Sequence, residues 1–462
     1  MKKIICFHDT DSGRDVQALT PIIYFLEKIL NYTVEQYYIY DTYKIITRVP
    51  DLVLTANIVG SKKFVSLSRE CYERGIPFFA LTAEGNLPEQ FFINGGHWGW
   101  NKEQILYQNK LCIWSKKVMG FYEAHCPDIN KDRLALTGAP GFDLYKMLQY
   151  QRNSTEVFPN QKSYRLIIGY AGWAFGKAYS NSDLQHLKRV SSYNFDENIK
   201  WMKEKRKEVE FILRSAIESN PDILFVLKKH PREHSPAAKE EPLNEMIQLQ
   251  NYDNVIYLRD NNVSLYKIIS SCHLWTCFES TTALEAWLLD IPTVYISPKS
   301  DTSRTTDTIT GSLVIKDEIE FENTIKKLRS AQLDEYFEDK VLIQNRKNII
   351  ERSIGFADGL NHVRTALLIQ EACNESKCKN KIVKLNLNEL YDLLLYQIMR
   401  LLLKVPVLNK LHKIRKHQFF TKNFSKSNLM KNQQDMFNII SNFYLKLDIK
   451  KSITQIRQES YE

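Results

Sequence analysis

The stretch SLYKIISSCHLWTCFESTTALEAWLLDIPTVYIS, residues 264–297, decides the fold class of this protein. It holds two short apolar runs, HLWTC (273–277) and IPTVYIS (291–297), and each follows a segment with helical periodicity, SLYKIISSC (264–272) and TALEAWLLD (282–290). Short apolar runs that alternate with amphipathic helices predict parallel strands joined by crossover helices. This part of the chain is therefore predicted to be an α/β domain with a parallel sheet.

The same alternation extends from this stretch to the beginning of the chain. We expect strands at 3–8, 51–56, 76–85, 111–115, 133–138, 163–172, 222–231 and 253–260, and helices at 20–31, 62–75, 117–125 and 198–219. Two consecutive α/β series of similar size are typical of a chain with two Rossmann-like halves. Ligands of such sheets bind beyond the carboxyl ends of the strands.

The 462 residues are enough for two domains with separate cores and an appendage. The polar, unpatterned stretch QRNSTEVFPNQKS (151–163) is predicted to link the two series. We expect an N-terminal Rossmann-like domain at 1–150 and a C-terminal Rossmann-like domain at 164–340. Closing helices at 341–376 and a basic amphipathic helical tail at 377–462 follow.

The positive charge of the chain is concentrated near its C-terminus. The chain has 63 Lys and Arg against 54 Asp and Glu, a net charge of +9. Residues 377–462 hold 14 Lys, 3 Arg and 6 acidic residues, which leaves residues 1–376 close to neutral at −2. An enzyme of nucleic acids would carry positive charge around its working site, so this distribution argues against a nucleic-acid partner.

The N-terminus and the cysteines favour a cytoplasmic protein. MKKIICFHD (1–9) has an apolar run of four residues, which is too short for a secretory signal and predicts a buried strand. The eight cysteines are scattered without a CxxC pair. This spacing argues against a zinc site and favours reduced thiols.

A glycine-rich segment, GYAGWAFGKA (169–178), follows a predicted strand. Ala171 and Ala178 stand where a Walker A motif needs glycine and a hydroxyl residue, and the glycine spacing also differs from GxGxxG. A glycine loop after a strand can still bring backbone N–H groups close to a ligand, and Gly172 is the candidate for such a contact. A simple tight turn is the alternative.

The segment VLKKHPRE (226–233) ends a predicted strand with Lys228, Lys229, His230 and Pro231. A side chain at the carboxyl end of a strand can reach a bound phosphate. The imidazole of His230 could donate a hydrogen bond to a phosphate oxygen or act as a general acid toward a leaving group. A solvated strand end without a ligand is the alternative.

In CFESTTALEAWLLDIP (277–292) a predicted strand ends and a helix begins. Ser280 or Thr281 suits the N-cap position, with Thr282 and Glu285 in the first turns. The hydroxyl groups and unpaired N–H groups at such a helix start can also hold an anion. Together with the strand end at His230, they predict a site for a nucleotide phosphate.

The K-x-H-P strand end and the S-T-T-x-x-E-A segment about 50 residues later resemble the donor domain of bacterial GT-B enzymes that make surface carbohydrates. This group includes bacterial sialyltransferases, capsular Kdo transferases and polyglycerol-phosphate polymerases. LTAEGN (81–86), LTGAPGFDLY (136–145) and FADGLNHVR (356–364) are similar to further motifs of the group, in the same order. The resemblance, closest to the surface carbohydrate biosynthesis proteins, implies a GT-B fold: two facing Rossmann-like domains with a helical C-terminal extension.

The resemblance also implies roles for residues of the donor half. His230 would bind the donor phosphate and assist departure of the nucleotide. Ser280 and Thr281 would hold the phosphate, and Glu285 would hydrogen-bond the ribose.

In the acceptor half the resemblance implies that Glu84 is the general base that deprotonates the acceptor hydroxyl. The sialyltransferase pattern has two adjacent acids before glycine, whereas this chain has Ala83-Glu84-Gly85. His8, Asp9 and Asp11, in the loop after the first strand, are therefore further candidates for the base.

No metal and no cofactor are expected apart from the nucleotide-sugar co-substrate. Asp9-Thr10-Asp11 matches the letters of a DxD motif, but it lies in the first loop of the N-terminal half. The metal chemistry of GT-A enzymes would not be placed there.

The tail carries the remaining signal. In ELYDLLLYQIMRLLLK (389–404) the polar residues fall along one helical stripe, and the segment is too short and interrupted to span a bilayer. KLHKIRKHQFF (410–420) adds a basic cluster with aromatic residues. This pattern predicts an in-plane anchor on the inner face of the cytoplasmic membrane; a helix packed on the body or on a second subunit is the alternative.

We therefore expect a glycosyltransferase that moves a nonulosonic acid or Kdo from a CMP donor onto a surface glycan or a lipid-linked acceptor. Transfer of a polyol phosphate from a CDP donor is the alternative reaction. A non-transferring GT-B protein, such as a sugar-nucleotide 2-epimerase, and a catalytically silent assembly subunit are alternatives from other classes.

Overall fold

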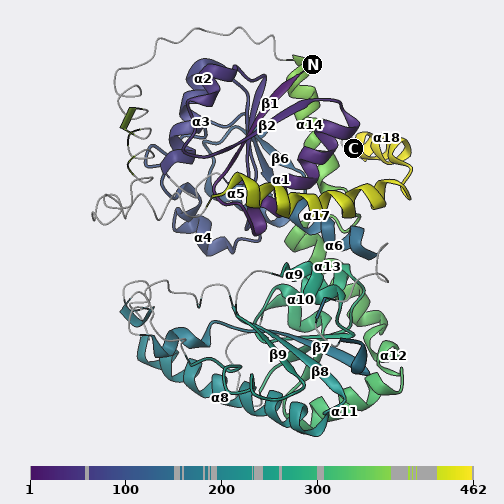
Figure 1. The fold of residues 1–462 in the computed structure, drawn as a ribbon. Helices are drawn as coiled ribbons and strands as arrows, with labels where there is room; N and C mark the ends of the chain where they lie inside the picture. Colours follow the sequence, from purple (N-terminus) through teal and green to yellow (C-terminus); the bar gives the residue numbers. More distant parts are fainter. Residues whose placement is uncertain are drawn as a thin grey trace. The chain divides into compact units, whose positions relative to one another are not determined.

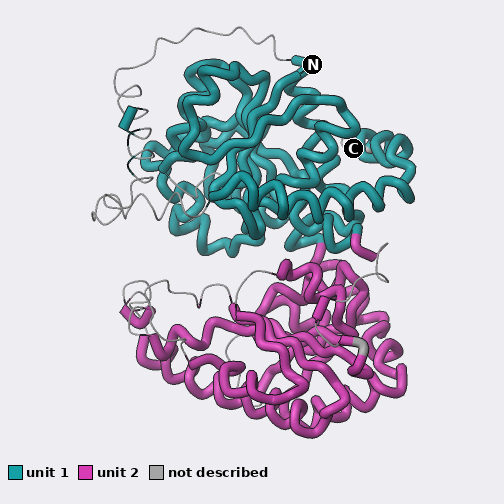
Figure 2. Tube along the Cα trace, in the orientation of Figure 1, with its two compact units in different colours: residues 1–147, 351–462 teal, residues 148–350 magenta. Residues whose placement is uncertain are grey.

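The computed structural model describes residues 2–57, 62–149, 157–158, 161–180, 183–185, 188, 195–230, 233, 243–259, 263–298, 306–375, 394–395, 398, 402 and 424–459. The chain divides into two compact units (Figure 2). Unit 1 comprises residues 1–147 and 351–462, and unit 2 comprises residues 148–350. Each unit is built around its own parallel sheet (Figure 1).

The sheet of unit 1 has six strands in the order β2-β1-β3-β4-β5-β6. Its strands are β1 (Lys3–His8), β2 (Thr33–Tyr38), β3 (Leu52–Thr55), β4 (Phe78–Ala80), β5 (Lys110–Ile113) and β6 (Leu134–Leu136). All pairs are parallel, and β1, next to the edge strand β2, places Ile4 beside Val34 on one side and Leu52 on the other. The interior of β1, Ile4–Phe7, is fully buried, as its unbroken apolar sequence predicts for a strand covered on both faces.

Helices connect the strands of unit 1, and the chain returns to this unit after residue 350 with further helices. They are α1 (Arg14–Tyr24), continued by the π-helix Phe25–Ile29, α2 (Lys44–Arg48), α3 (Lys62–Arg74), α4 (Glu89–Ile93), α5 (Lys116–His125), α6 (Asp143–Leu148), α13 (Lys340–Ile354, shared with unit 2), α14 (Asn361–Glu375), α17 (Lys426–Tyr444) and α18 (Ile449–Glu459). In Figure 1, α17 lies alongside α1.

The sheet of unit 2 also has six parallel strands, in the order β12-β11-β10-β7-β8-β9. Its strands are β7 (Leu166–Ala171), β8 (Ile223–Lys228), β9 (Val255–Leu258), β10 (Leu274–Cys277), β11 (Thr293–Ile296) and β12 (Leu313–Ile315). Its helices are α8 (Phe195–Ser219), α9 (Leu265–Ser270), α10 (Thr282–Leu288), α11 (Glu318–Arg329) and α12 (Leu333–Phe337).

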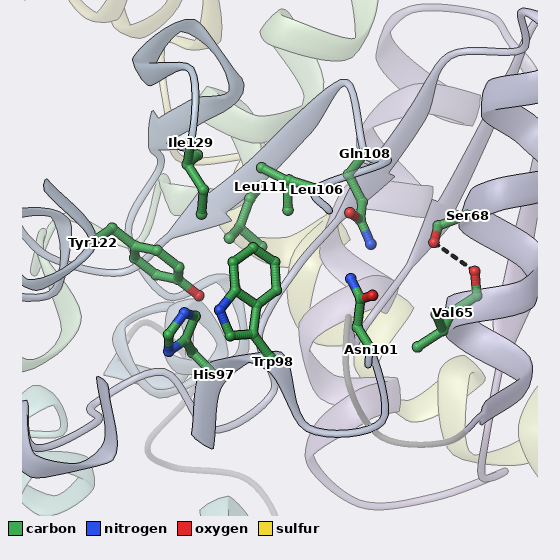
Figure 3. Close-up of a pocket in the computed structure, with 10 residues that line it drawn as sticks. All are labelled: Val65, Ser68, His97, Trp98, Asn101, Leu106, Gln108, Leu111, Tyr122 and Ile129. Atoms are coloured by element: carbon green, nitrogen blue, oxygen red, sulfur yellow. Dashed lines mark hydrogen bonds between the residues drawn. The ribbon is translucent and has the colours of Figure 1, made fainter. Parts of the chain in front are cut away.

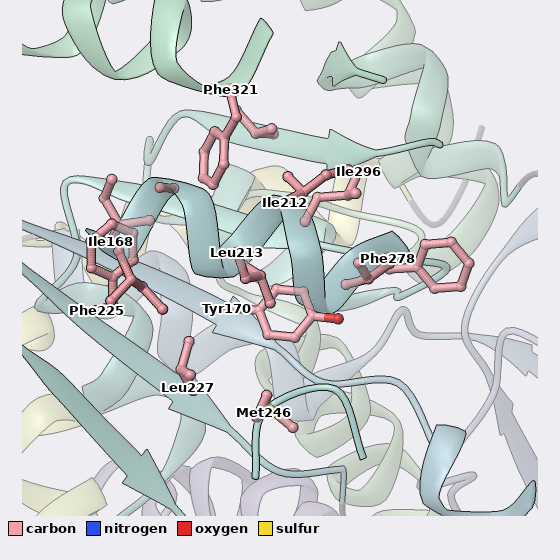
Figure 4. Packing of buried hydrophobic residues seen from close by; sticks show 14 of the residues in the cluster. Ile168, Tyr170, Ile212, Leu213, Phe225, Leu227, Met246, Phe278, Ile296 and Phe321 are labelled. Carbon is pink, nitrogen blue, oxygen red and sulfur yellow. The ribbon is translucent and has the colours of Figure 1, made fainter. Parts of the chain in front are cut away.

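The core of unit 2 forms between this sheet and the long helix α8. Ile212 and Leu213 of α8 pack with Phe225 and Leu227 of β8, and Tyr170 of β7 lies among them (Figure 4). The amphipathic pattern of residues 198–219 thus predicts correctly which helix covers the sheet. The actual helix begins a few residues earlier, at Phe195.

Each predicted strand and helix has a counterpart in the structure, with differences in bounds and in number. The strand expected at 76–85 spans only Phe78–Ala80, and the helices α2, α4, α6, α11 and α12 were not predicted. The helix expected at 20–31 begins earlier, at Arg14, so Pro21 lies inside it rather than near its start. A proline cannot donate the hydrogen bond of its position, and the helix goes on as a π-helix from Phe25. The strands β2 and β12 were not predicted; both are edge strands, and β2 is largely polar (TVEQYY).

The two tail segments expected to bind a membrane, 389–404 and 410–420, lie outside the described residues except at positions 394, 395, 398 and 402. Within the described part of the chain, no helix combines the length and the apolar character needed to cross a membrane.

Candidate functional site

The strand order of unit 2 marks the place where its sheet is suited to bind a ligand. β7 lies between β8 and β10, because the chain first builds one edge with β8 and β9 and later the other with β10, β11 and β12. In open parallel sheets ligands bind at such a switch point, outside the carboxyl ends of the strands. The loop from Gly172, the strand end at Lys228–His230 and the junction at Glu279–Thr282 follow β7, β8 and β10, respectively.

The loop after β7 approaches its neighbours so closely that Gly172 has no room for a side chain. Its backbone N–H donates to the Lys228 carbonyl at 2.9 Å. A Cβ at this position would lie 2.4 Å from Cε of Met246 and 3.0 Å from the Lys228 carbonyl oxygen. Close packing alone accounts for this glycine, and its contact with a ligand stays a prediction.

The end of β8 carries two lysines that are buried. Lys228 and Lys229 are 8% and 3% exposed, so the alternative of a solvated strand end does not hold for them. Nζ of Lys228 donates to the Lys229 carbonyl at 3.1 Å. His230 follows and is partly exposed, whereas Pro231 lies outside the described residues. The two lysines at the carboxyl end of β8 are thus buried, and His230 lies closer to solvent.

The junction between β10 and α10 gathers three hydroxyl groups. Thr281 occupies the N-cap position without a side-chain hydrogen bond to the helix. Oγ of Ser280 lies 3.1 Å from Oγ1 of Thr282, which accepts from the indole N–H of Trp275 at 3.0 Å. Glu285 is 2% exposed inside α10. The predicted phosphate-binding hydroxyls are therefore adjacent, and their contact with a phosphate stays a prediction.

Glu279, just before these hydroxyls, has a left-handed backbone with φ of +45°. Non-glycine residues rarely adopt this conformation. The Tyr295 hydroxyl fixes it, because it accepts from the Glu279 N–H at 3.1 Å and donates to the carboxylate at 2.7 Å. Burial and this hydrogen bond raise the pKa of Tyr295, which keeps the hydroxyl protonated. The turn that presents Ser280 is therefore rigidly held.

Two buried carboxyl groups lie against the loop after β7, and the sequence analysis did not identify them. Glu245 is fully buried, and its Oε1 accepts from the Tyr170 hydroxyl and from the Trp173 N–H, both at 3.0 Å. Glu233 is 1% exposed, and its Oε1 accepts from the Gly176 N–H at 2.6 Å. Burial, followed by the charge of Glu233, raises the pKa of Glu245 to about 8.

Unit 1 has a switch point of its own at the loop after β1, because β1 lies between β2 and β3. Gly13 ends this loop with φ of +79° and ψ of −159°, a region open essentially to glycine alone. The chain then turns directly into α1, and Asp15 enters the first turn of that helix.

Three carboxylates, Asp9, Asp15 and Glu84, interact at this edge of unit 1. Burial, together with the charges of Asp9 and Glu84, raises the pKa of Asp15 to about 6. Glu84 follows β4, is 62% exposed at its side chain, and lies 3.7 Å from a guanidinium nitrogen of Arg14. The structure thus joins the predicted base Glu84 to Asp15, which sequence reasoning missed; an acid two residues after the glycine of HDTDSGRD was the available signal.

Of the other candidates, Asp11 holds α17 in place, whereas His8 is the last residue of β1. The Asp11 carboxylate accepts from the Ser425 N–H at 2.8 Å, and its carbonyl accepts from the Asn432 amide at 2.8 Å. His8 is fully buried, with its Nε2 2.9 Å from Oε1 of Gln36. Burial lowers the pKa of His8 to about 4, so that it is neutral at pH 7. A catalytic role for Asp11 stays a prediction beside this structural one.

Polar atoms near Glu84 are buried without a hydrogen-bond partner in the described part of the chain. They are the indole Nε1 of Trp114 and Oδ1 of Asn86. Trp114 packs against Gly85 so tightly that a Cβ there would lie 2.4 Å from its ring. Buried polar groups normally have partners, and water or a ligand could supply them here.

A small cavity elsewhere in unit 1 has room for about one water molecule (Figure 3). Nδ1 of His97, Oδ1 of Asn101 and Oε1 of Gln108 line it, and none has a partner among the described residues. None of the predicted site residues lines this cavity. The residues that the structure describes also contain no group of three or more His, Cys, Asp or Glu placed to hold a metal ion.

No family model and no curated protein matches this sequence. Among solved structures, a putative UDP-N-acetylglucosamine 2-epimerase from Listeria monocytogenes is similar with a TM-score of 0.51 and 12% identity, over 83% of this chain and 100% of its own. The UDP-GlcNAc 2-epimerase from Neisseria meningitidis bound to UDP-GlcNAc has a TM-score of 0.50 and 14% identity, over 80% and 100%. The wall teichoic acid polymerase TagF has 11% identity over 81% of this chain and 89% of its own, with a TM-score of 0.47.

These likenesses show the fold. The chain has the GT-B fold, with two Rossmann-like units of six parallel strands and a helical C-terminal extension, as the sequence analysis predicted.

Proposed function

We propose that this protein is a nucleotide-sugar-dependent glycosyltransferase that acts on a surface glycan or a lipid-linked acceptor. The observation that carries the proposal is the set of three strand ends around the switch point of unit 2. The lysines and His230 end β8, the hydroxyls of Ser280 and Thr282 follow β10, and the glycine-rich loop follows β7 between them. Cationic and hydroxyl groups of this kind suit the phosphates of a nucleotide.

In this proposal unit 2 holds the donor. The hydroxyls of Ser280 and Thr281 bind phosphate oxygens, and His230 donates a hydrogen bond or a proton to the leaving phosphate. The donor we expect is a CMP-linked nonulosonic acid or Kdo, from the resemblance of the K-x-H-P and S-T-T segments to the donor motifs of enzymes that use such sugars.

Unit 1 holds the acceptor and the base. A carboxylate of Glu84 or Asp15 takes the proton of the acceptor hydroxyl, whose oxygen attacks the anomeric carbon. The bond from that carbon to the phosphate oxygen breaks, and the nucleotide departs with the electron pair. The raised pKa of Asp15 suits a base that works near neutral pH. The amphipathic segment at 389–404 and the basic cluster at 410–420 are proposed to hold the enzyme at an anionic membrane surface, where a lipid-linked acceptor resides.

A sugar-nucleotide 2-epimerase is the second candidate, and a specific observation favours it. Epimerisation needs carboxylates around the sugar ring, and the charges of Asp9 and of the sequence-distant Glu84 both act on Asp15. The two solved structures with a TM-score of at least 0.50 described above are both epimerases of UDP-GlcNAc.

A thermal-shift screen with CMP, CDP, UDP and GDP tests the proposal. We expect CMP to raise the melting temperature, and we expect His230→Ala and Ser280→Ala to abolish the shift. Lys326→Ala, an exposed cation on α11 of the same unit, is the matched control and keeps it. A response to UDP alone contradicts the cytidine assignment, and conversion of UDP-GlcNAc into its C2 epimer would establish the second candidate.

A further inference from the structure

The glycine-rich loop after β7 is anchored by buried carboxyl groups. Two of its backbone N–H groups, those of Trp173 and Gly176, donate to Glu245 and Glu233 at 3.0 and 2.6 Å. A nucleotide loop ordinarily turns such N–H groups toward a phosphate. Here the N–H groups of Trp173 and Gly176 already donate to carboxyl groups. These two hydrogen bonds therefore fix the path of the loop.

Glu233 also connects this loop to the neighbouring strand ends. Its own N–H donates to the His230 carbonyl at 3.1 Å, so the carboxyl group sits one turn after the proposed phosphate ligand. Its Oε2 accepts from the Asn244 amide at 3.1 Å, and the same amide donates to the Tyr257 hydroxyl of β9 at 2.9 Å. One side chain thus joins the segments that follow β7 and β8 to the next strand.

Glu245 secures the beginning of the loop. Its Oε1 receives the Trp173 N–H and the hydroxyl of Tyr170, the penultimate residue of β7. The same oxygen would lie 3.3 Å from a Cβ on Gly172. The side chain is fully buried, and its Oε2 has no hydrogen-bond partner in the described part of the chain.

We propose that Glu233 and Glu245 are positioning residues of the donor site, which hold the glycine-rich loop against the strand end at His230 without touching substrate. The donor role rests on the proposed function, whereas the anchoring of the loop does not. Neither residue was identified from the sequence. Both act through the groups that they bind, the loop N–H groups and the side chains of Tyr170 and Asn244.

The charge of the pair gives this arrangement a dependence on pH. Glu245 is faced by Glu233, the Tyr170 hydroxyl and the Trp173 N–H, and Cys277 of β10 acts electrostatically on Tyr170. The pKa of Glu245 is raised to about 8 in the folded protein, so its stabilising contribution is complete below the ordinary pKa near 4.5 and is lost as the pH rises through 8. Ionised Glu245 would repel Glu233 and loosen the loop between them.

Hydrogen exchange of the full-length chain tests the anchoring directly. We expect Glu233→Ala and Glu245→Ala to accelerate exchange at Trp173 and Gly176 by about tenfold or more, the loss of roughly one hydrogen bond. Glu245→Gln keeps an oxygen acceptor and is expected to retain the slow exchange. Glu204→Gln, an exposed acid on α8, is the matched control. Unchanged exchange at both amides in the alanine variants would overturn the proposal.

Nucleotide affinity then tests the donor role. We expect the wild-type affinity for CMP to fall between pH 7 and pH 9, and Glu245→Gln to remove that fall, because glutamine has no charge to acquire. The same decline in Glu245→Gln would overturn the role of this side chain. If the wild type binds no nucleotide while the exchange rates respond as expected, the proposed function fails and the anchoring stands.

Discussion

The two units place acidic side chains beside a switch point in opposite ways. In unit 2, Glu233 and Glu245 are almost completely buried, and both accept hydrogen bonds from loop N–H groups. In unit 1, the Glu84 side chain is 62% exposed, and its ion pair with Arg14 spans 3.7 Å, longer than a hydrogen bond. Burial and the charges of Asp9 and Glu84 raise the pKa of the neighbouring Asp15.

This difference separates a structural use of carboxyl groups from a chemical one. A carboxyl group that is buried and accepts from backbone N–H groups, as in Glu233 and Glu245, fixes a loop and is not exposed to a substrate. Asp15, whose pKa is raised first by burial and then by the charges of Asp9 and Glu84, is suited to accept a proton near neutral pH. We therefore assign the chemistry to the carboxylates of unit 1 and the support of the nucleotide site to those of unit 2.

The largest expected effect is the loss of turnover on removing the base. Asp15→Asn or Glu84→Gln, whichever residue is the base, should lower kcat by about 10²- to 10⁴-fold, the usual contribution of a general base. Steady-state assays with the CMP-linked donor measure it. Glu73→Gln, an exposed acid on α3 of the same unit, is the control. Full turnover in both Asp15→Asn and Glu84→Gln would show that neither carboxylate of unit 1 is the base.

The pH profile sharpens the choice between the two carboxylates. If Asp15 is the base, its pKa of about 6 requires the ionised form to disappear below pH 6. At pH 5 about a tenth of it remains ionised, and kcat/KM should be about tenfold lower than at pH 7. A profile that stays flat down to pH 5 would instead point to Glu84.

A smaller effect concerns the loop of unit 2. Gly172→Ala places a Cβ 2.4 Å from Met246 and should destabilise unit 2 by about 1–3 kcal/mol, the usual cost of overpacking. The same change at Gly120, in the interior of α5, meets no atom within 4 Å and should stabilise by about 0.5–1 kcal/mol. Thermal unfolding of the two variants compares them, and equal effects would contradict the close packing of the loop.

The smallest effect concerns the anchor of the C-terminal extension on unit 1. The Tyr444 hydroxyl lies 2.5 Å from Nε2 of His362, whose Nδ1 lies 2.8 Å from the Asp143 carboxylate. Tyr444→Phe removes the hydroxyl and should cost about 0.5–1.5 kcal/mol in thermal unfolding. Tyr336→Phe on the exposed side of α12 is the control, and an equal cost there would argue against an anchoring role for this contact.

Much of the fold was predictable because apolar periodicity is a local property of the sequence. The run Lys3–His8 matched β1 to the residue, and the pattern of 62–75 matched α3 within one residue. The edge strand β2 escaped prediction because its mostly polar residues lack that signal. His230 and Ser280 were singled out by their chemistry; the structure places them after β8 and β10, and their role at a nucleotide site stays a prediction.

The sequence by itself determined the alternation of strands and helices, and hence a parallel α/β chain in two series. It also determined which strand ends carry phosphate-seeking groups. Only the tertiary structure decided the strand order that makes β7 and β10 neighbours, the burial of Lys228 and Lys229, and the meeting of Asp15 with Glu84. The physical reason is that strand order and burial depend on contacts between residues far apart in the chain, which no local pattern encodes.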